Sequence, residues 1–296
     1  MISVCIPIYQ YDVYELIKEI YNQCIASSIN FEIICIDDNS DSFYKTKNKR
    51  IEEFDYTSYI ELNENIGRSK IRNLFLKKSN FSSLLFLDCD CSIPNKNFII
   101  KYSENINKDI VYGGRKHHKK KPLDEKIVLR WEYGKNREDL SYNERINSPY
   151  LSFRSNNFLV KKKTLELYRF DESISTYGHE DTLFAFQLEK EKINIHHIDN
   201  HVIHEGLETN IDFLNKTKSA VKNLFILYLS GKIESEKIKL LKTYRFLKKI
   251  KLTFFMRAFS SFIIKICTKK LLHKNPKIFW LDIYKLFYLI KIKHDV

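Results

Sequence analysis

Residues 84–92 read Leu84-Leu85-Phe86-Leu87-Asp88-Cys89-Asp90-Cys91-Ser92, so an apolar run leads directly into two acids one residue apart. The run has the length of a buried strand, and a continuous apolar strand is typical of the parallel part of an α/β sheet. Ligands of such sheets bind beyond the carboxyl ends of the strands, where Asp88 and Asp90 lie. Because alternate strand residues point to the same side, both carboxylates can hold Mg²⁺ or Mn²⁺ together with substrate phosphates. On these residues alone, a polar turn that merely ends the strand is an equally good interpretation.

The chain has 296 residues, of which 44% are hydrophobic. This length suits one large domain or one domain with an appendage, and the apolar content allows a substantial core. The six cysteines include no CxxC pair, which gives a zinc ribbon no support. Reduced thiols in the cytosol are the simplest account of them. Residues 2–8 already resemble a strand without a basic leader, so we expect no signal peptide and a cytoplasmic location.

The net charge of +13 is unevenly distributed along the chain. Residues 237–296 carry 16 Lys and Arg against two acids, a net charge of +14, whereas the other 236 residues have a net charge of −1. Such asymmetry suggests an anionic partner, either a membrane or a nucleic acid. Residues 252–266 and 278–292 are rich in aromatic residues but interrupted by Lys or Arg, so neither is expected to span a membrane. Basic helices of this kind lie in the membrane interface, which predicts a peripheral location on the inner face of the cell membrane. The alternative is a helical appendage that packs on the catalytic domain or on a second copy of the chain.

Two strand-like runs near the N-terminus, residues 2–9 and 31–36, are separated by a helical pattern of apolar residues. This order predicts a right-handed β-α-β unit with a parallel pair of strands. Asp37 and Asp38 follow the second run, where they are placed to hydrogen-bond a ribose or base, although a plain turn explains them equally. A later glycine, Gly67, precedes another helix that is placed to meet a nucleotide, and this signal is weak by itself.

The second half of the domain holds further polar positions. Glu180 and Asp181 begin a helix, where acids are favoured by the helix dipole, so they are either functional or only helix caps. His201 and His204 lie too far from the acids in sequence to form a local metal motif. Any metal site that includes them must be formed by folding.

Several short motifs, taken together, resemble those of family 2 glycosyltransferases with the GT-A fold. They occur in the family's order over roughly residues 1–210, and the ordered set is more specific than any single member. The matching pieces are Val4 to Tyr9, Ile36-Asp37-Asp38-Asn39-Ser40, Asn65-Ile66-Gly67-Arg68 with Arg72-Asn73, Leu87-Asp88-Cys89-Asp90, and Gly178-His179-Glu180-Asp181. Ser155-Asn156-Asn157-Phe158, followed by Phe170-Asp171-Glu172, is similar to the acceptor half of galactosyltransferase-like enzymes.

The resemblance implies roles for individual residues. Asp181 corresponds to the catalytic base of the transfer, and Glu180 corresponds to its acceptor-binding neighbour. Residues 88–90 correspond to the DxD motif, which binds the donor diphosphate and a divalent metal, Mn²⁺ or Mg²⁺. The implied metal ligands are Asp88, Asp90 and His204, the last matching a histidine that completes the site in some relatives. The implied nucleotide-sugar residues are Pro7, Tyr9, Asp37, Asp38, Asn65, Gly67, Arg68, Asp88, Cys89 and Asp90, and the implied acceptor residues are Asn156, Asn157 and His179.

The predicted fold is α/β: a GT-A, Rossmann-like, mainly parallel mixed sheet flanked by helices, with a basic α-helical C-terminal extension. We expect a catalytic domain over residues 1–215, divided into a nucleotide-sugar half (1–95) and an acceptor half (96–215), and a helical region over 216–296. The expected function is an inverting, metal-dependent transfer from a UDP-hexose to a glycan or lipid-linked saccharide, as in bacterial surface polysaccharide synthesis. The expected partners are this donor, this acceptor and an anionic membrane surface, without nucleic acid, while the oligomeric state stays open.

Two other classes of protein share parts of this pattern. A nucleotidyltransferase also combines such a sheet with paired acids, but it normally has a glycine-rich phosphate loop after the first strand. Residues 7–12 contain no glycine, which counts against this class. A non-enzymatic protein that binds anionic polymers would explain the basic C-terminal region but not the acidic clusters at strand ends.

Overall fold

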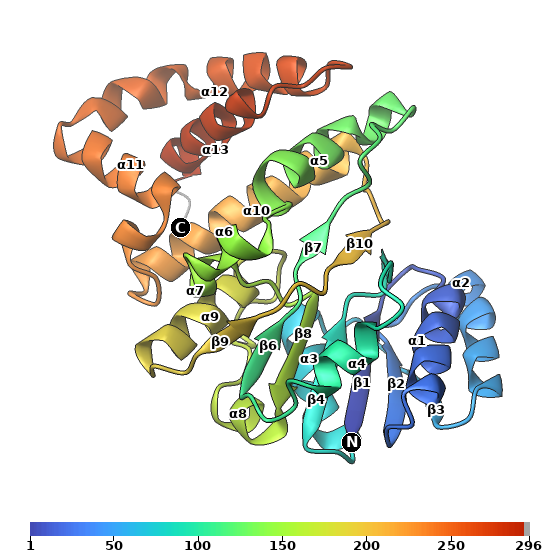
Figure 1. Ribbon diagram of the computed structural model, residues 1–296. Coiled ribbons are helices and arrows are strands. Elements are labelled where there is room, and N and C mark those ends of the chain that lie inside the picture. The colour runs from blue at the N-terminus through green and yellow to red at the C-terminus, as the bar shows by residue number, and fades with distance from the viewer. Residues whose placement is uncertain (293–296) are drawn as a thin grey trace. The chain divides into compact units, whose positions relative to one another are not determined.

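The computed structural model describes residues 1–292, and the chain divides into two compact units. The first unit comprises Met1–His117, Asp139–Ser175 and Glu180–Gly206. The second comprises His118–Glu138, Thr176–His179 and the chain from Leu207 onward. In Figure 1 the colour runs from blue at the N-terminus to red at the C-terminus, so the segments of each unit can be found by residue number.

The first unit is built on a mixed sheet whose described strands lie in the order β3-β2-β1-β4-β8-β6-β9. Strands β3, β2, β1 and β4 are mutually parallel, as are β6 and β9, whereas β8 runs antiparallel to both β4 and β6. Pairing of Ile6 with Cys35 sets the register of the predicted β-α-β unit. The strands are β1 (Ile2–Ile8), β2 (Phe31–Asp37), β3 (Thr57–Glu61), β4 (Ser83–Leu87), β6 (Ile110–Tyr112), β8 (Asn157–Lys161) and β9 (Ile195–His197).

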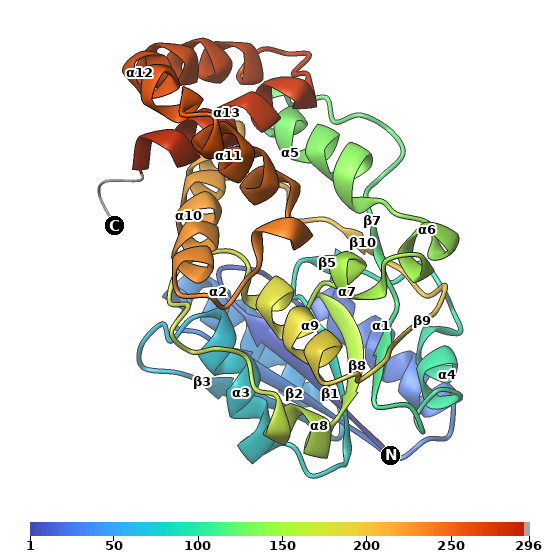
Figure 2. The same cartoon turned by 90° about the vertical axis from the view of Figure 1, so that its left-hand side faces the viewer.

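Helices cover both faces of this sheet. Ile17 of α1 and Phe98 of α4 belong to the apolar core on one face, the near face in Figure 1. Phe75 of α3, Leu165 of α8 and Phe184 of α9 belong to the core on the other face, which Figure 2 turns toward the viewer. The helices of this unit are α1 (Tyr14–Ala26), α2 (Ser42–Asn48), η1 (Lys49–Glu53), α3 (Arg68–Lys78), α4 (Phe98–Ser103), α6 (Tyr142–Ile146), α7 (Pro149–Ser152), α8 (Lys162–Leu167) and α9 (Glu180–Lys190).

Strand β4 is the buried strand that precedes the two acids of residues 84–92. All of its residues are buried, because cores lie on both sides of it. Phe86 stacks on Phe158 of β8 with ring centroids 5.0 Å apart, and it meets Phe75 edge-on at 5.6 Å. Truncating a buried ring of this kind to alanine typically costs about 3–5 kcal/mol. The strand that leads into Asp88 is therefore firmly held.

A smaller sheet lies in the same unit and consists, in the described chain, of three short strands in the order β5-β10-β7. These strands are β5 (Cys91–Ser92), β10 (Val202–His204) and β7 (Arg115–Lys116). β10 runs antiparallel to β5, with His204 opposite Cys91, and parallel to β7, with Ile203 opposite Lys116. Because β5 directly follows Asp90, this sheet brings the end of β10 beside the second acid.

The second unit is helical in the described residues. Asn210 joins two of its parts, because its side chain accepts a hydrogen bond from Leu129 N (2.9 Å) and donates one to Glu125 O (2.8 Å). Leu129, Phe213, Cys267 and Leu281 share its apolar core. None of the helices within residues 1–292 has the length and apolarity needed to cross a bilayer. The helices are η2 (Glu125–Ile127), α5 (Val128–Tyr133), η3 (Gly134–Glu138), α10 (Asn210–Leu229), η4 (Ser235–Lys237), α11 (Lys239–Lys249), α12 (Leu252–Leu271) and α13 (Ile278–Ile292).

Candidate active site

Two acids at the end of β2 have partners within the protein. Asp37 is fully buried, and its carboxylate accepts hydrogen bonds from Ser40 N (2.6 Å) and from the Tyr59 hydroxyl (2.8 Å). Burial, together with the neighbouring Asp37 carboxylate, raises the pKa of Tyr59, so this hydroxyl remains a donor. These contacts give Asp37 a structural role at the turn that follows the strand.

The second acid of the pair, Asp38, holds the loop that opens α3. Its carboxylate accepts hydrogen bonds from Ile66 N (2.7 Å) and Gly67 N (3.0 Å), and its carbonyl accepts one from the Asn65 side chain (3.1 Å). Burial raises the pKa of Asp38, and the two backbone donors oppose that shift. Gly67 adopts φ 82°, a left-handed conformation that favours glycine. One of the two acids that the resemblance assigns to the nucleoside thus fixes the loop that presents Arg68.

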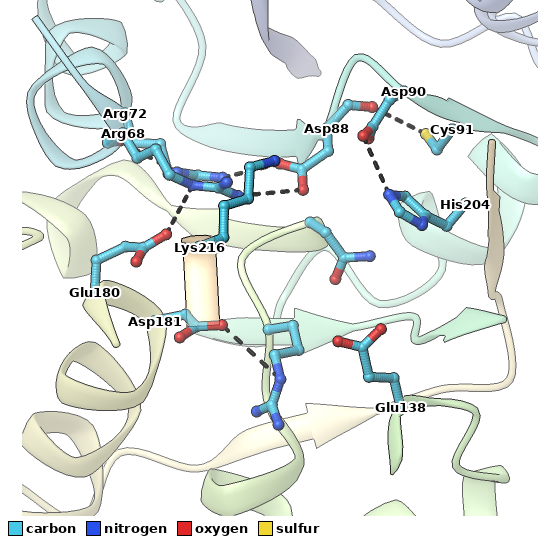
Figure 3. Close-up of polar contacts among 12 residues, drawn as sticks. Arg68, Arg72, Asp88, Asp90, Cys91, Glu138, Glu180, Asp181, His204 and Lys216 are labelled. Carbon is cyan, nitrogen blue, oxygen red and sulfur yellow. Dashed lines mark hydrogen bonds and ion pairs between the residues drawn. The ribbon is translucent and has the colours of Figure 1, made fainter. Parts of the chain in front are cut away.

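Two arginines of α3 reach the first acid after β4. Arg72 Nη2 lies 2.8 Å from Asp88 Oδ1, and Arg68 Nη2 lies 3.7 Å from Asp88 Oδ2. Arg72 is 1% exposed, and burial lowers its pKa, while the Asp88 carboxylate opposes that shift. Its buried Nε atom has no hydrogen-bond partner among the described residues. Asp88 is therefore neutralised by cationic side chains, as Figure 3 shows.

The second acid faces a histidine. Asp90 Oδ2 lies 3.1 Å from His204 Nε2, although the two residues are 114 positions apart in the sequence. Burial acts to raise the pKa of Asp90, but His204, when its Nε2 carries a proton, and the nearby charges of Arg115 and Arg68 outweigh burial and lower this pKa. A Cβ atom at Gly206 would lie 2.5 Å from Asp90 Oδ2, so the backbone approaches this carboxylate as closely as glycine allows. The carboxylate is thereby confined between β10 and the residues after it.

The pair of Asp90 and His204 fits a divalent cation that shares its coordination with a substrate. The residues that the structure describes contain no cluster of three or more His, Cys, Asp or Glu able to hold a metal by themselves. Metals bound beside nucleotides commonly take one or two protein ligands and complete their shell with phosphate oxygens and water. Carboxylate oxygen suits Mg²⁺ and Mn²⁺, whereas imidazole nitrogen suits transition metals. The mixed donor set therefore fits Mn²⁺ better than Mg²⁺.

The cysteines of this stretch are not nucleophiles. Burial is the largest cause that raises the pKa of both Cys89 and Cys91, which keeps their thiols protonated. Cys91 Sγ donates a hydrogen bond to Asp88 O (3.0 Å). Cys91 therefore holds the backbone around the first acid.

The two acids at the start of α9 face different partners. Glu180 is buried, and its Oε1 lies 2.8 Å from Arg68 Nε, so it meets the guanidinium that also approaches Asp88 (Figure 3). Asp181 Oδ1 accepts a hydrogen bond from Thr182 N (2.7 Å), and its Oδ2 lies 4.0 Å from Arg154 Nε. The Asp181 side chain is 19% exposed, which leaves it accessible from solvent.

The remaining sequence-predicted positions have varied surroundings. Asn157 is fully buried, and its amide donates to Gly114 O (2.8 Å) and Asn200 O (2.9 Å), contacts that give it a structural role. Asn156 is 4% exposed, and its carbonyl accepts a hydrogen bond from Asp88 N (3.0 Å). Pro7 lies within β1, and Tyr9 follows that strand with 53% of its surface exposed. His179 belongs to the second unit and adopts φ 72°, which is unusual for a non-glycine residue.

Sequence reasoning missed two residues next to the predicted metal ligand. His117 Nε2 lies 3.2 Å from His204 Nδ1, and His117 Nδ1 lies 2.6 Å from Asp139 Oδ1. In the sequence, His117 belongs to a basic run that resembles a solvated loop, and Asp139 carries no motif. No local signal identifies them, because β7 and β10 meet only in the folded chain.

Comparison with known proteins places the chain in a family of enzymes. The model of the family "Glycosyl transferase family 2" matches residues 3–164, more than half of the chain, and the chain belongs to this family. The resemblance to family 2 glycosyltransferases and the predicted class of enzyme, a glycosyltransferase, are thereby confirmed. A search of curated proteins gives no match.

The predicted fold is supported by the structure of a mannosyltransferase. A mannosyltransferase from Pyrobaculum calidifontis, solved with GDP-Man and Mn²⁺, aligns with a TM-score of 0.52 and 17% identity over 74% of this chain. The alignment covers 61% of that mannosyltransferase, so this chain spans less than two thirds of its length. TarS (residues 1–349) from S. aureus, solved with UDP, aligns with a TM-score of 0.46 and 16% identity over 99% of this chain and 91% of TarS. The predicted GT-A class, with a mainly parallel mixed sheet and C-terminal helices, is confirmed.

Proposed function

We propose that this protein is an inverting, metal-dependent glycosyltransferase that moves a hexose from a nucleoside diphosphate sugar, such as a UDP-hexose, to a glycan or lipid-linked saccharide. The observation that carries the proposal is the convergence of a metal-ligand pair and a cationic cluster at one edge of the sheet. Asp90 and His204 form the pair, and Arg68 and Arg72 form the cluster around Asp88. A diphosphate with a bound cation is the ligand whose charges match both.

The donor side would bind and stabilise the leaving group. Arg68 is the better placed of the two arginines to contact the diphosphate, because 44% of its side chain is exposed whereas Arg72 is buried. A divalent cation held by Asp90 and His204 would supply further positive charge for the developing diphosphate. The loop at residues 65–67, which Asp38 fixes, would contact the nucleoside. Arg72 would keep Asp88 oriented.

On the acceptor side, Asp181 would act as the general base. Its Oδ1 is held by Thr182 N, and this contact orients the carboxylate. The carboxylate would take the proton of the acceptor hydroxyl as that oxygen attacks the anomeric carbon. Attack on the face opposite the leaving diphosphate inverts the configuration at this carbon. Glu180 would contribute through Arg68, and Asn156 and His179 remain proposed acceptor contacts.

The direct test is a calorimetric screen of the full chain against UDP- and GDP-sugars with Mn²⁺, with Mg²⁺ and without metal. We expect one nucleotide sugar to bind, and its affinity to rise with the metal and more with Mn²⁺ than with Mg²⁺. Equal nucleotide affinity with and without metal would contradict the metal-dependent mechanism. Absence of binding by every nucleotide sugar would contradict the proposed activity.

We further propose that the basic C-terminal region docks on an anionic membrane surface, on the cytoplasmic side. The support is the exposed face of α12, where Phe255, Phe259 and Phe262 follow helical spacing and are 65%, 64% and 64% exposed. Cys267 and Leu271, on the opposite side of the helix, are buried in the unit's core. The net charge of +14 over residues 237–296 complements anionic lipid, at about 1 kcal/mol for each Lys or Arg near the surface. Such a location would suit a lipid-linked acceptor, as in surface polysaccharide synthesis.

A further inference from the structure

A continuous line of four polar side chains runs through the small sheet. Asp90 Oδ2 contacts His204 Nε2 at 3.1 Å, His204 Nδ1 contacts His117 Nε2 at 3.2 Å, and His117 Nδ1 contacts Asp139 Oδ1 at 2.6 Å. Its members follow the strand order β5-β10-β7, because Asp90 precedes β5, His204 ends β10 and His117 follows β7. Both histidines are buried, with 6% and 3% of their surfaces exposed. Solvent therefore has little access to the two imidazoles.

The chemistry of the line determines where the protons lie when both imidazoles are neutral. An ionised carboxylate only accepts hydrogen bonds, so His117 Nδ1 must donate to Asp139. A neutral imidazole has one donor and one acceptor nitrogen, so His117 Nε2 accepts from His204 Nδ1. His204 Nε2 is then left with a lone pair, and this lone pair faces an oxygen of Asp90. Two acceptors at 3.1 Å repel each other unless a cation lies between them.

We propose that His117 and Asp139 are positioning residues that prepare His204 as a metal ligand. Asp139 selects the tautomer of His117, and His117 in turn selects the tautomer and ring orientation of His204. The inference rests on the proposed function, because it takes the cation shared by Asp90 and His204 to be the donor's divalent metal. In metal sites generally, a ligating histidine gives its other N–H to such a partner, and removing the partner weakens metal binding.

A backbone hydrogen bond adds to the contact between His117 and Asp139. His117 N donates a hydrogen bond to Asp139 Oδ2 (3.2 Å) in addition to the contact through its ring. Asp139 thus binds the backbone and the ring of His117 with its two carboxylate oxygens, and these contacts fix the rotamer of His117. His117 and Asp139 also flank residues 118–138, the segment that belongs to the second unit. One side-chain contact therefore links the residue before this segment to the residue after it, and the same contact orients the proposed metal ligand.

The test measures Mn²⁺ affinity rather than turnover. The signal of free Mn²⁺ in electron paramagnetic resonance, recorded on the full chain with UDP present, gives the Mn²⁺ dissociation constant. We expect His117→Leu and Asp139→Asn to raise this constant about 10–100-fold. The melting temperature reports whether each variant folds. The UDP affinity measured without metal reports the state of the nucleotide site, and it should not change.

Three further variants distinguish a role of His117 in orienting His204 from a role in filling space. His117→Gln places an amide oxygen where His117 Nε2 accepts, so it should restore most of the Mn²⁺ affinity that His117→Leu loses. Adding Asp139→Asn to His117→Gln should cause no further loss, because no imidazole tautomer remains to be selected. His201→Leu is the matched control, since His201 pairs with Asp199 (3.7 Å) outside the line.

The outcomes separate the inference from the proposed function. One outcome would overturn the positioning role alone. In it, the wild type binds Mn²⁺ in the presence of UDP, and the His117→Leu and Asp139→Asn variants bind Mn²⁺ with the same affinity. Failure of His117→Gln to restore affinity, with its melting temperature unchanged, would also overturn it. Wild-type protein without any Mn²⁺-dependent UDP binding would overturn the proposed metal site and the inference together.

Discussion

Arg68 Nε lies 2.8 Å from Glu180 Oε1, and this contact joins the start of α3 to the first turn of α9. The same guanidinium approaches Asp88 through its Nη2 atom (3.7 Å). One side chain therefore links an acid of the proposed donor half with an acid of the proposed acceptor half. Binding of donor and binding of acceptor should consequently depend on each other.

The first prediction concerns Glu180→Gln, which keeps the size of the side chain and removes its charge. Because Glu180 holds Arg68, we expect the KM for the nucleotide sugar to rise about two- to fivefold, a small effect since Arg68 is partly exposed to solvent. Bisubstrate steady-state kinetics measures it, with Glu191→Gln as the control, because Glu191 is exposed and directly follows α9. A change confined to the KM of the acceptor would show that Glu180 acts on the acceptor alone.

The second prediction concerns Asp181→Asn. The amide oxygen can still accept the hydrogen bond from Thr182 N, so the fold should be kept while the basicity is lost. We expect kcat to fall about 10²–10⁴-fold with donor binding spared. The control is Asp199→Asn, since the Asp199 side chain is 69% exposed. If Asp181 only caps α9, stability would drop by about 1 kcal/mol and kcat would stay near normal. A product with the donor's anomeric configuration would also refute the base assignment.

The third prediction concerns Gly206→Ala. The added Cβ would lie 2.5 Å from Asp90 Oδ2 and 2.6 Å from Asp90 Cβ, so the Asp90 side chain must move. We expect Mn²⁺-dependent UDP affinity to fall about tenfold or more, as for other disturbances around a metal ligand. Gly231→Ala is the control, because a Cβ there meets nothing within 4 Å. That variant should lose about 1 kcal/mol of stability from its left-handed backbone and bind UDP normally. Unchanged metal dependence in Gly206→Ala would contradict the role of Asp90.

The fourth prediction concerns stability at acid pH. His197 is buried and bridges two groups: its Nδ1 accepts from Arg145 Nη1 (3.2 Å) and its Nε2 donates to Pro149 O (3.0 Å). Burial, and then the Arg145 charge, lower the pKa of His197 to about 4 from 6.5. Because the unfolded chain binds this proton first as the pH falls, the stabilising contribution is complete above pH 6.5 and is lost between 6.5 and about 4.

The loss should reach about 3 kcal/mol in the free energy of unfolding, on the basis of about 1.4 kcal/mol for each pKa unit. Urea unfolding of wild type and of His197→Gln, followed by circular dichroism at several pH values, measures it. The wild type should lose more stability than the variant on acidification. Parallel pH profiles for the two proteins would disprove the assignment to His197.

The fifth prediction tests the membrane proposal. Replacing Phe255, Phe259 and Phe262 by Ser removes the apolar contact of α12, so flotation with anionic vesicles should fall sharply while catalysis on a soluble acceptor is kept. Phe43→Ser is the control, because Phe43 is 59% exposed on α2 of the first unit. Raising the salt concentration should weaken the binding of wild type, since the basic residues contribute electrostatically. A wild-type protein that fails to float with anionic vesicles at low salt would rule the membrane surface out.

Much of the architecture could be predicted from short stretches of sequence. Residues 84–87 form a strand buried on both faces, and their continuous apolar run of strand length is typical of such a strand. The acids after β2 and β4 follow their strands directly, so the edge of the sheet on which they lie was predictable from their order. The helical, basic character of the C-terminal region is likewise a property of contiguous residues.

The partners of those acids could not be derived from the residues alone, because they depend on which strands become neighbours; only the family resemblance implied that His204 lies near Asp90. His204 and Asp90 are 114 positions apart, and His117 and His204 are 87 apart. Their contacts exist because β10 inserts between β5 and β7. Amino-acid order alone therefore determined the strands, the positions of the acids and the basic C-terminal helices. Only the tertiary structure decided that Asp88 faces arginine and Asp90 faces histidine. Hydrogen bonds between residues so far apart in the sequence form only after the strands have paired in their final register.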